Sequence, residues 1–396
     1  PLDEWDVGLV TSMATMFNTA SAFNQNIDTW NVTSVIDMHS MFRGAVSFDQ
    51  PLNSWDVNSV VNTSSMFESA EVFNQPLNDW DVSAVANMSS MFQGALVFDQ
   101  PLNAWDVTSV TLMPSMFEQA ELFNGEINNW NVASVTNMQE MFKDAIAFNQ
   151  PIENWDTGEV LTMAEMFHGA ANFNQPIGAW NTAFVTTMLG MFEEAVTFDQ
   201  PLTSWNVASV STMEAMFKNA TTFNQDINSW NVRGVTSMAE MFSEASTFNQ
   251  SLNNWRVAGV STMEAMFENA IAYDQTMEQW DLGTVNMKST FNNASALNQY
   301  LGDWDVSGVS DMVDMLNDTG LTRENYDNTL IAWSEQNLTS GITFGAQGLP
   351  YCDAFEERQA IIDTYGWTIE NDVLDCPVPE CTVLISPLNG AIDIPV

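Results

Sequence analysis

Tryptophan recurs along this chain at intervals of 25 residues. Twelve follow this spacing and the thirteenth comes after 24, because one residue is missing between Val285 and Met287. They are Trp5, Trp30, Trp55, Trp80, Trp105, Trp130, Trp155, Trp180, Trp205, Trp230, Trp255, Trp280 and Trp304. A period of roughly 20–50 residues is typical of arrays whose units pack only on their neighbours. Four strands do not fit in 25 residues, so a propeller blade is excluded, whereas one strand and one helix fit.

The apolar residues divide each unit into two halves. In one unit the first half has the spacing of a leucine-rich repeat: Leu77, Trp80, Val82 and Val85. The second half has one apolar stripe at helical spacing: Val85, Met88, Met91, Phe92 and Ala95. We predict a strand at Trp80-x-Val82, a short helix capped by Ser83, and a turn at Pro101.

These units predict an α/β solenoid, a leucine-rich-repeat-like stack of strand–helix turns. A parallel sheet would form one face and short helices the other. With parallel strands about 4.8 Å apart, thirteen turns would give a rod or arc about 60 Å long. Tryptophan, valine, phenylalanine and leucine would form continuous interior columns, and the methionines would fill the core between them.

An Asn or Asp follows the inward phenylalanine of each unit, and Gln usually comes next, with Gly125 as an exception. No two consecutive units carry Asp at this position, which reads Asn24, Asp49, Asn74, Asp99, Asn124, Asn149, Asn174, Asp199, Asn224, Asn249, Asp274 and Asn298. We predict a side-chain ladder that satisfies turn amides, in which adjacent carboxylates would repel each other.

A second polar column directly follows the tryptophans, and we expect it to face outward. We interpret it as a candidate binding face: Asp6, Asn31, Asp56, Asp81, Asp106, Asn131, Asp156, Asn181, Asn206 and Asn231. Asp56, Asp81 and Asp106 belong to consecutive units, and charges about 4.8 Å apart would repel by roughly 1 kcal/mol even in water. A bound calcium ion would relieve this repulsion. The alternative is a hydrated acidic face with loosely held counterions.

The segment Asn74-Gln-Pro-Leu-Asn-Asp-Trp80-Asp-Val-Ser-Ala-Val-Ala-Asn-Met-Ser-Ser-Met-Phe92 resembles the BspA-like leucine-rich-repeat surface proteins, which carry the DUF285 repeat. The resemblance covers residues 1 to about 320. It implies a secreted bacterial surface protein used in adhesion, with an export signal upstream and often a sorting signal downstream. The family carries no catalytic residues to transfer. Because the chain begins inside the repeat pattern, we expect it to be a piece of a longer protein.

We divide the chain into a repeat solenoid over 1–320, a capping module over 321–375, and a linker with the first strand of a truncated immunoglobulin-like or fibronectin-like domain over 376–396. The capping module predicts a helix over 324–335 capped by Thr322, a helix over 354–364 between Asp353 and Gly366, and a strand at 367–369.

The chain has three cysteines, and none of their spacings fits a zinc motif. We predict a Cys352–Cys376 disulfide, and a Cys376–Cys381 disulfide or three reduced thiols are the alternatives.

The charge excludes several functions. Eight basic residues stand against 51 acidic ones, giving a net charge of −43, which repels nucleic acid and anionic lipid. No run is apolar enough to span a membrane, and no catalytic or nucleotide-binding motif occurs. His39 and His168 are expected to be solvated.

We therefore expect a non-enzymatic extracellular module that binds proteins or glycans on another cell surface. The alternative is a structural segment of a large secreted appendage that assembles with its own copies.

Overall fold

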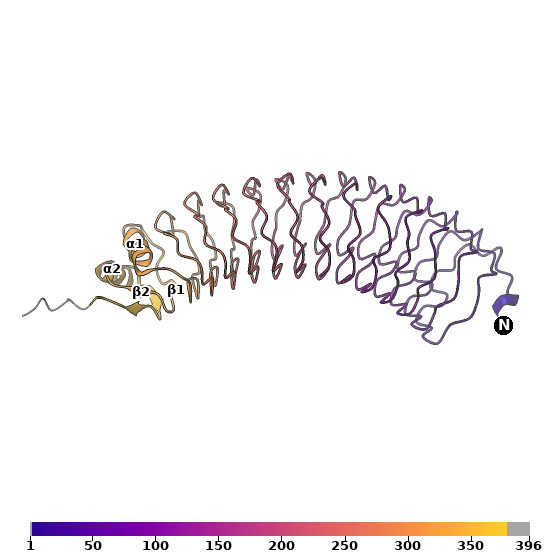
Figure 1. Ribbon diagram of the computed structural model, residues 1–396, viewed down its shortest axis with the longest axis horizontal. Helices are drawn as coiled ribbons and strands as arrows, with labels where there is room; N and C mark the ends of the chain where they lie inside the picture. The colour runs from indigo at the N-terminus through magenta and orange to yellow at the C-terminus, as the bar shows by residue number, and fades with distance from the viewer. Residues whose placement is uncertain (1, 378–396) are drawn as a thin grey trace, which may run out of the picture.

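The structure, a computed structural model, describes residues 2–377. It has a tandem architecture in which 25-residue coils follow one another along a curved stack (Figure 1). A short 3-10 helix, η1 (Leu2–Glu4), begins the described chain, and residues 5–322 contain turns and single-residue bridges but no α-helix. The remaining elements, α1, β1, β2, α2, β3 and β4, all lie after residue 322.

Parallel bridges join each coil to the next at one position. The ladder begins at the pair Ser12–Asp37, continues through Asn62 and Asn87, and reaches Asp311 without a break. The predicted parallel sheet is therefore only one residue wide in each coil. It also lies seven residues after the tryptophan, at Asn87, and not at Trp80-x-Val82, so the predicted position of the strand was wrong.

The predicted helix in each coil was also wrong. Its place is taken by turns whose backbone groups alternate between two partners. Ser90 N and Phe92 N donate to carbonyl oxygens of the next coil, whereas Met91 N donates to Met88 O within its own coil. In a helix the amide N–H groups would all bond to carbonyl oxygens of the same segment. In these turns about half of the amide N–H groups bond to the next coil, and these bonds join neighbouring coils. Ser83 does not cap a helix, because its own N–H and hydroxyl donate to Asp81.

Each coil has a left-handed backbone conformation at two positions, which in the first coil are residues 15 and 19. Thr15 and Thr19 have φ values of 58°, and the corresponding Ser90 and Gly94 have 55° and 67°. A residue other than glycine costs roughly 1–2 kcal/mol when its backbone is held in the left-handed conformation. The coils therefore need strong stacking contacts to hold these turns.

Three aromatic columns supply much of that stacking. Phe42, Phe67 and their equivalents form an unbroken series from Phe17 to Phe291, with ring centroids 5.3–5.7 Å apart. A second phenylalanine of each coil stacks on the first, as Phe48 does on Phe42 at 4.2 Å. Such pairs contribute about 0.5–1.5 kcal/mol beyond their hydrophobic burial.

The tryptophans form the third column and add hydrogen bonds between coils. The indole Nε1 of Trp105 donates to Leu77 O in the preceding coil at 2.8 Å, and Trp130 repeats this contact with Leu102 O at 2.9 Å. The indoles from Trp30 to Trp304 are thus both buried and satisfied, whereas Trp5, in the first coil, is 53% exposed. A single coil could not provide this acceptor, which makes the arrangement dependent on the stack.

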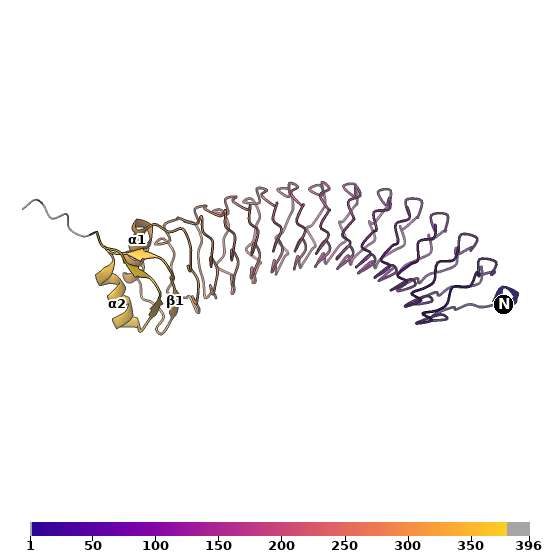
Figure 2. The same ribbon diagram turned by 60° about the horizontal axis from the view of Figure 1, so that its bottom comes forward.

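The spacing of the columns explains the curvature. Equivalent rings are 5.3–5.7 Å apart in the Phe42 column but 6.2 Å apart for Trp130 and Trp155 and 6.4 Å apart for Trp205 and Trp230. The coils therefore diverge toward the tryptophan side, which becomes the outside of the arc. In Figures 1 and 2, β1 lies at the inner edge and α1 on the outer side.

The predicted Asn/Asp ladder is confirmed. Asn149 Oδ1 accepts from Asn174 N at 3.0 Å and from Gln175 Nε2 at 2.9 Å, and the pattern recurs along the stack. At the end of the ladder, Asn298 Oδ1 accepts from Thr322 N and from the side chain of Asn325. Both donors lie at the start of the capping module. The ladder therefore joins the coils to the cap.

The exception at Gly125 also has a structural reason. A Cβ at Gly125 would lie 2.2 Å from the carbonyl oxygen of Gln100, so no side chain fits there. In this coil Asp99 Oδ1 accepts only from Asn124 N among the described bonds.

The C-terminal elements cover the last coil. They are α1 (Arg323–Ser334), β1 (Thr343–Gly345), β2 (Pro350–Tyr351), α2 (Phe355–Tyr365), β3 (Thr368–Glu370) and β4 (Val373–Leu374). β1 extends the bridge ladder through Met312–Phe344 and pairs in parallel with β3, while β2 pairs in parallel with β4. Trp333 of α1 extends the indole ladder by donating to Leu301 O.

Thr322 caps α1 and Gly366 ends α2 in a left-handed conformation, as predicted. Asp353 does not cap α2. The N-cap is Ala354, and the buried carboxylate of Asp327 accepts the N–H groups of Cys352, Asp353 and Ala354 instead.

Cys352 and Cys376 form a disulfide, the first of the two pairings considered above. Cys381 and the expected strand of an immunoglobulin-like or fibronectin-like domain lie outside the described residues.

Candidate functional site

The column that directly follows the tryptophans is exposed along the whole stack. We call the following ten residues the outer column: Asp6, Asn31, Asp56, Asp81, Asp106, Asn131, Asp156, Asn181, Asn206 and Asn231. All ten face solvent, as predicted. They adjoin the indole column, on the side where the coils are farther apart.

Each outer-column residue also has a local structural role. Its Oδ1 accepts the N–H two residues later, as Asp6 does from Gly8 and Asp106 from Thr108, at 3.2 and 3.1 Å. This is the Asx-turn geometry, which only Asp and Asn can supply in this form. The preference for Asp and Asn in this column is the sequence signal for such a turn, which was not predicted above.

The hydrogen bonds also fix the ionisation of Asp81. Its Oδ1 accepts from the Ser83 hydroxyl at 2.6 Å and from the Ser83 N–H at 3.1 Å. The hydroxyl bond, and then the amide bond, lower the pKa of Asp81 against a small opposing effect of burial. Asp81 therefore carries its charge at neutral pH. Asp305, further along the same position, has its pKa lowered by Ser307 in the same way.

The three consecutive carboxylates Asp56, Asp81 and Asp106 do not converge. The adjoining indoles of Trp55 and Trp80 lie 6.4 Å apart. Within residues 2–377, no group of three or more His, Cys, Asp or Glu side chains is placed to hold a metal ion. The geometry therefore provides no ready-made calcium cage at these residues.

The turn segments beside the bridge ladder carry a different pattern, in which acidic and basic side chains pair between coils. Arg43 lies 2.8 Å from Glu68, and Lys143 and Lys218 contact Glu165 and Glu240. These pairs connect neighbouring coils and neutralise the basic side chains on this face.

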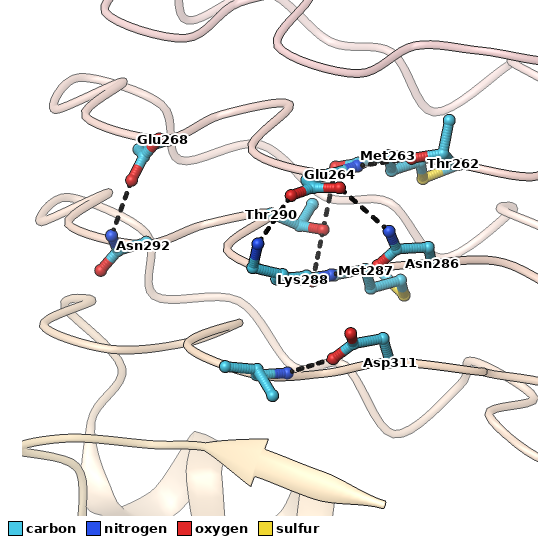
Figure 3. Close-up of polar contacts among 11 residues, drawn as sticks. Thr262, Met263, Glu264, Glu268, Asn286, Met287, Lys288, Thr290, Asn292 and Asp311 are labelled. Atoms are coloured by element: carbon cyan, nitrogen blue, oxygen red, sulfur yellow. Dashed lines mark hydrogen bonds and ion pairs between the residues drawn. The ribbon is translucent and has the colours of Figure 1, made fainter.

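Figure 3 shows this pairing at the coil that lacks one residue. Lys288 Nζ donates to Glu264 Oε1 at 2.9 Å, and Asn286 Nδ2 donates to the other oxygen at 3.2 Å. The Thr290 hydroxyl contacts the carbonyl oxygens of Met263 and Met287 at 3.0 and 2.7 Å. The residue that this coil lacks is the one that precedes the bridge residue in other coils. Asn286 therefore still forms its bridges, and the bridge ladder stays intact.

His168 belongs to this paired face, so the expectation that it is solvated was wrong. Its Nδ1 is buried and lies 3.3 Å from Glu193 Oε2 and 3.8 Å from Glu165 Oε2. The contact with Glu193 is not a well-aligned hydrogen bond, so we treat it as an ion pair. Glu193 raises the pKa of His168 above its usual value, against the opposing effect of burial. His39 is more exposed and lies 3.0 Å from Asp37.

The coils and the sequence period define a tandem-repeat protein. The model of the family described as "Mycoplasma protein of unknown function, DUF285" matches residues 1–105, 73–175, 97–200, 150–255, 173–280 and 238–341. The chain belongs to this family, and the last match extends into the segment that carries α1. None of the curated proteins compared with the chain matches it. In residues 2–377 no helix has the length and apolarity needed to cross a lipid bilayer.

Proposed function

We propose that this chain is the leucine-rich-repeat-like solenoid of a secreted, BspA-like surface protein, and that it binds proteins or glycans on other cells without catalysing a reaction. The outer column is the observation that carries this proposal. Ten exposed Asp and Asn side chains recur in register, and each is held by its own turn. Such a preorganised surface loses little side-chain entropy on binding.

The arc supports the same function, because repeat stacks offer long curved surfaces to their partners. The net charge of −43 keeps such a surface soluble and disfavours non-specific contact with anionic lipid or nucleic acid. Extracellular placement agrees with the disulfide between Cys352 and Cys376, since disulfides persist in oxidising compartments.

One observation favours self-assembly as a second candidate function. Ile36, Val61 and Leu161 occupy the same position beside the bridge ladder and are 46–51% exposed. Ile36 and Val61 lie on adjacent coils, whereas Ala86, Thr111 and Thr136 separate them from Leu161. An exposed apolar pair such as Ile36 and Val61 is a candidate contact for another copy. The high negative charge opposes such association, so we rank it second.

One experiment separates the two functions. The full chain is measured by light scattering and then applied, fluorescently labelled, to host and bacterial cells. A recognition module stays monomeric at micromolar concentration and binds cells saturably. The substitutions Asn131→Ser, Asn181→Ser and Asn206→Ser together keep a hydroxyl acceptor for the turns but remove the exposed side-chain amides, and binding should fall. Self-association that disappears on Ile36→Lys, together with no cell binding, would instead establish the second function.

A further inference from the structure

The eight basic residues of the chain divide into two groups. Arg43, Lys143, Lys218, Lys288, Arg323 and Arg358 each lie within 4.0 Å of a carboxylate oxygen. Among residues 2–377, no such ion pair forms at Arg233 or Arg256. In a chain with 51 acidic residues, two uncompensated guanidinium groups are unusual.

Both of these arginines line the same hollow on the outer-column side. Its volume is about 420 Å³, and it lies where Asn231 and Arg256 occupy the same position of successive coils. Asn228 and Asn254 add two further amide side chains. Pockets of a few hundred cubic ångströms suit small ligands, and this one is lined by amides and guanidinium groups.

Neutral groups hold Arg256 in place. Its Nη2 donates to Gln279 Oε1 at 2.9 Å and its Nη1 to Gln279 O at 3.2 Å. Asp281, at the equivalent position of the next coil, accepts from Val257 N with its Oδ1 at 2.8 Å and lies beyond ion-pair distance of Arg256. The guanidinium is therefore oriented without being neutralised, and it retains donors for a ligand.

The neighbouring amides are also oriented by the coils. Asn228 Oδ1 accepts from Asn254 N at 2.9 Å, so the amide nitrogen of Asn228 remains a donor. Asn231 Oδ1 faces the backbone N–H of Arg233 at 3.5 Å, which leaves its amide nitrogen as a donor too. Amide groups with oriented donors match sugar hydroxyls, and a guanidinium group matches a carboxylate.

We propose that this hollow, bounded by Arg233 and Arg256, binds a carboxylated sugar residue of a glycan. The field of the whole chain favours one acidic unit on an otherwise neutral glycan over an acidic protein, because a net charge of −43 repels a polyanion at long range. This inference rests on the proposed recognition function and assigns it a ligand class and a place in the stack.

The repeat supplies substitutions that should leave the fold intact. Most coils carry Asp or Asn where Arg256 stands, and four carry Ala where Arg233 stands. Arg256→Asn and Arg233→Ala therefore restore residues that other coils already use. Arg43→Gln removes the same charge from the paired face and serves as the control.

The test is a calorimetric or NMR titration of the full chain with methyl glucuronide and, in parallel, with methyl glucoside, which lacks the carboxylate. We expect the glucuronide to bind at least about tenfold more tightly than the glucoside, since charge-assisted bonds are the stronger ones. Each pocket variant should lose at least about tenfold in affinity for the glucuronide, whereas Arg43→Gln should bind like the parent chain.

Equal binding of the two sugars, or equal binding by the pocket variants, would overturn the inference. Tight binding of a polyglutamate peptide lost in the same variants, without glucuronide binding, would also overturn it and identify an acidic peptide site. If the parent chain binds cells but no acidic sugar, this inference fails while the recognition function stands. If the parent chain binds neither cells nor an acidic sugar and self-associates, both this inference and the proposed recognition function fail.

Discussion

The Asn/Asp ladder allows a stability prediction in which a single substitution type is compared at two adjacent positions. Asn149 Oδ1 accepts from Asn174 N and Gln175 Nε2, and Asn174 Oδ1 accepts from Asp199 N and Gln200 Nε2, all at 2.9–3.0 Å. Asn149→Ala removes both bonds and leaves a partly buried amide without its acceptor. We expect a loss of about 2–4 kcal/mol in the free energy of unfolding.

Substitution by Asp keeps the acceptor and isolates the charge. At residue 149 both ladder neighbours are neutral Asn, so Asn149→Asp should change stability by less than about 0.5 kcal/mol. Asn174→Asp places a carboxylate next to Asp199, where the adjoining rings of Phe173 and Phe198 are 5.9 Å apart. Two charges at that separation repel by about 0.7 kcal/mol in water and about 2.8 kcal/mol at an effective dielectric constant of 20.

Urea unfolding followed by circular dichroism gives the midpoints at low salt and in 1 M NaCl. Since a repeat array can unfold in parts, hydrogen exchange of the residue 174 amide reports the local effect of the residue 149 variants, and exchange of the residue 199 amide that of Asn174→Asp. Asn174→Asp should be less stable than Asn149→Asp by about 1–3 kcal/mol, and salt should reduce the difference. Equal stability of the two Asp variants, or a difference that salt does not change, would refute the electrostatic explanation of the alternation.

Further predictions concern single positions and ions. Tyr273 replaces phenylalanine in its column, and its hydroxyl is buried without a partner, so Tyr273→Phe should raise the urea midpoint by the equivalent of about 1 kcal/mol. Ala215 has a φ of 53°, so Ala215→Gly should stabilise by up to about 1 kcal/mol, whereas Ala239→Gly, outside the left-handed positions, should not. The raised pKa of His168 means that its pairing with Glu193 stabilises the fold below the histidine's unfolded pKa. That contribution disappears as pH rises through the folded pKa, and His168→Gln should abolish this part of the pH profile of stability. Calcium and magnesium at equal concentration should raise the melting temperature equally, because only screening is expected, and a shift specific to calcium would show that a site exists.

The sequence was sufficient to predict the period, the core columns and the Asn/Asp ladder. These features depend on residue type at a fixed spacing, and the stack simply repeats them. The helix predicted over Val85–Ala95 failed for a physical reason. A stripe at spacings of three and four suits a helix, but it also suits successive turns whose amides bond to the next coil, and that choice depends on contacts 24 residues away.

The left-handed backbone positions could not be predicted from the sequence for a related reason. They are occupied by Ser, Glu, Ala, Thr, Asp, Asn, Gln and Gly in different coils, so no glycine signature marks them. In the candidate site, exposure of the outer column could be predicted from alternation, but the Asx turns and the unpaired state of Arg233 and Arg256 needed the coordinates.

Small-angle X-ray scattering of the full chain tests the central claim most directly, namely that the coils form one continuous stack presenting a single outer column. Twelve steps of about 6 Å place the first and last tryptophan coils roughly 70 Å apart along the arc. We predict a rod-like scattering region and a radius of gyration clearly above the roughly 21 Å of a compact chain of 396 residues. A compact value near 21 Å, or scattering from several separate globules without a rod-like cross-section, would contradict the account.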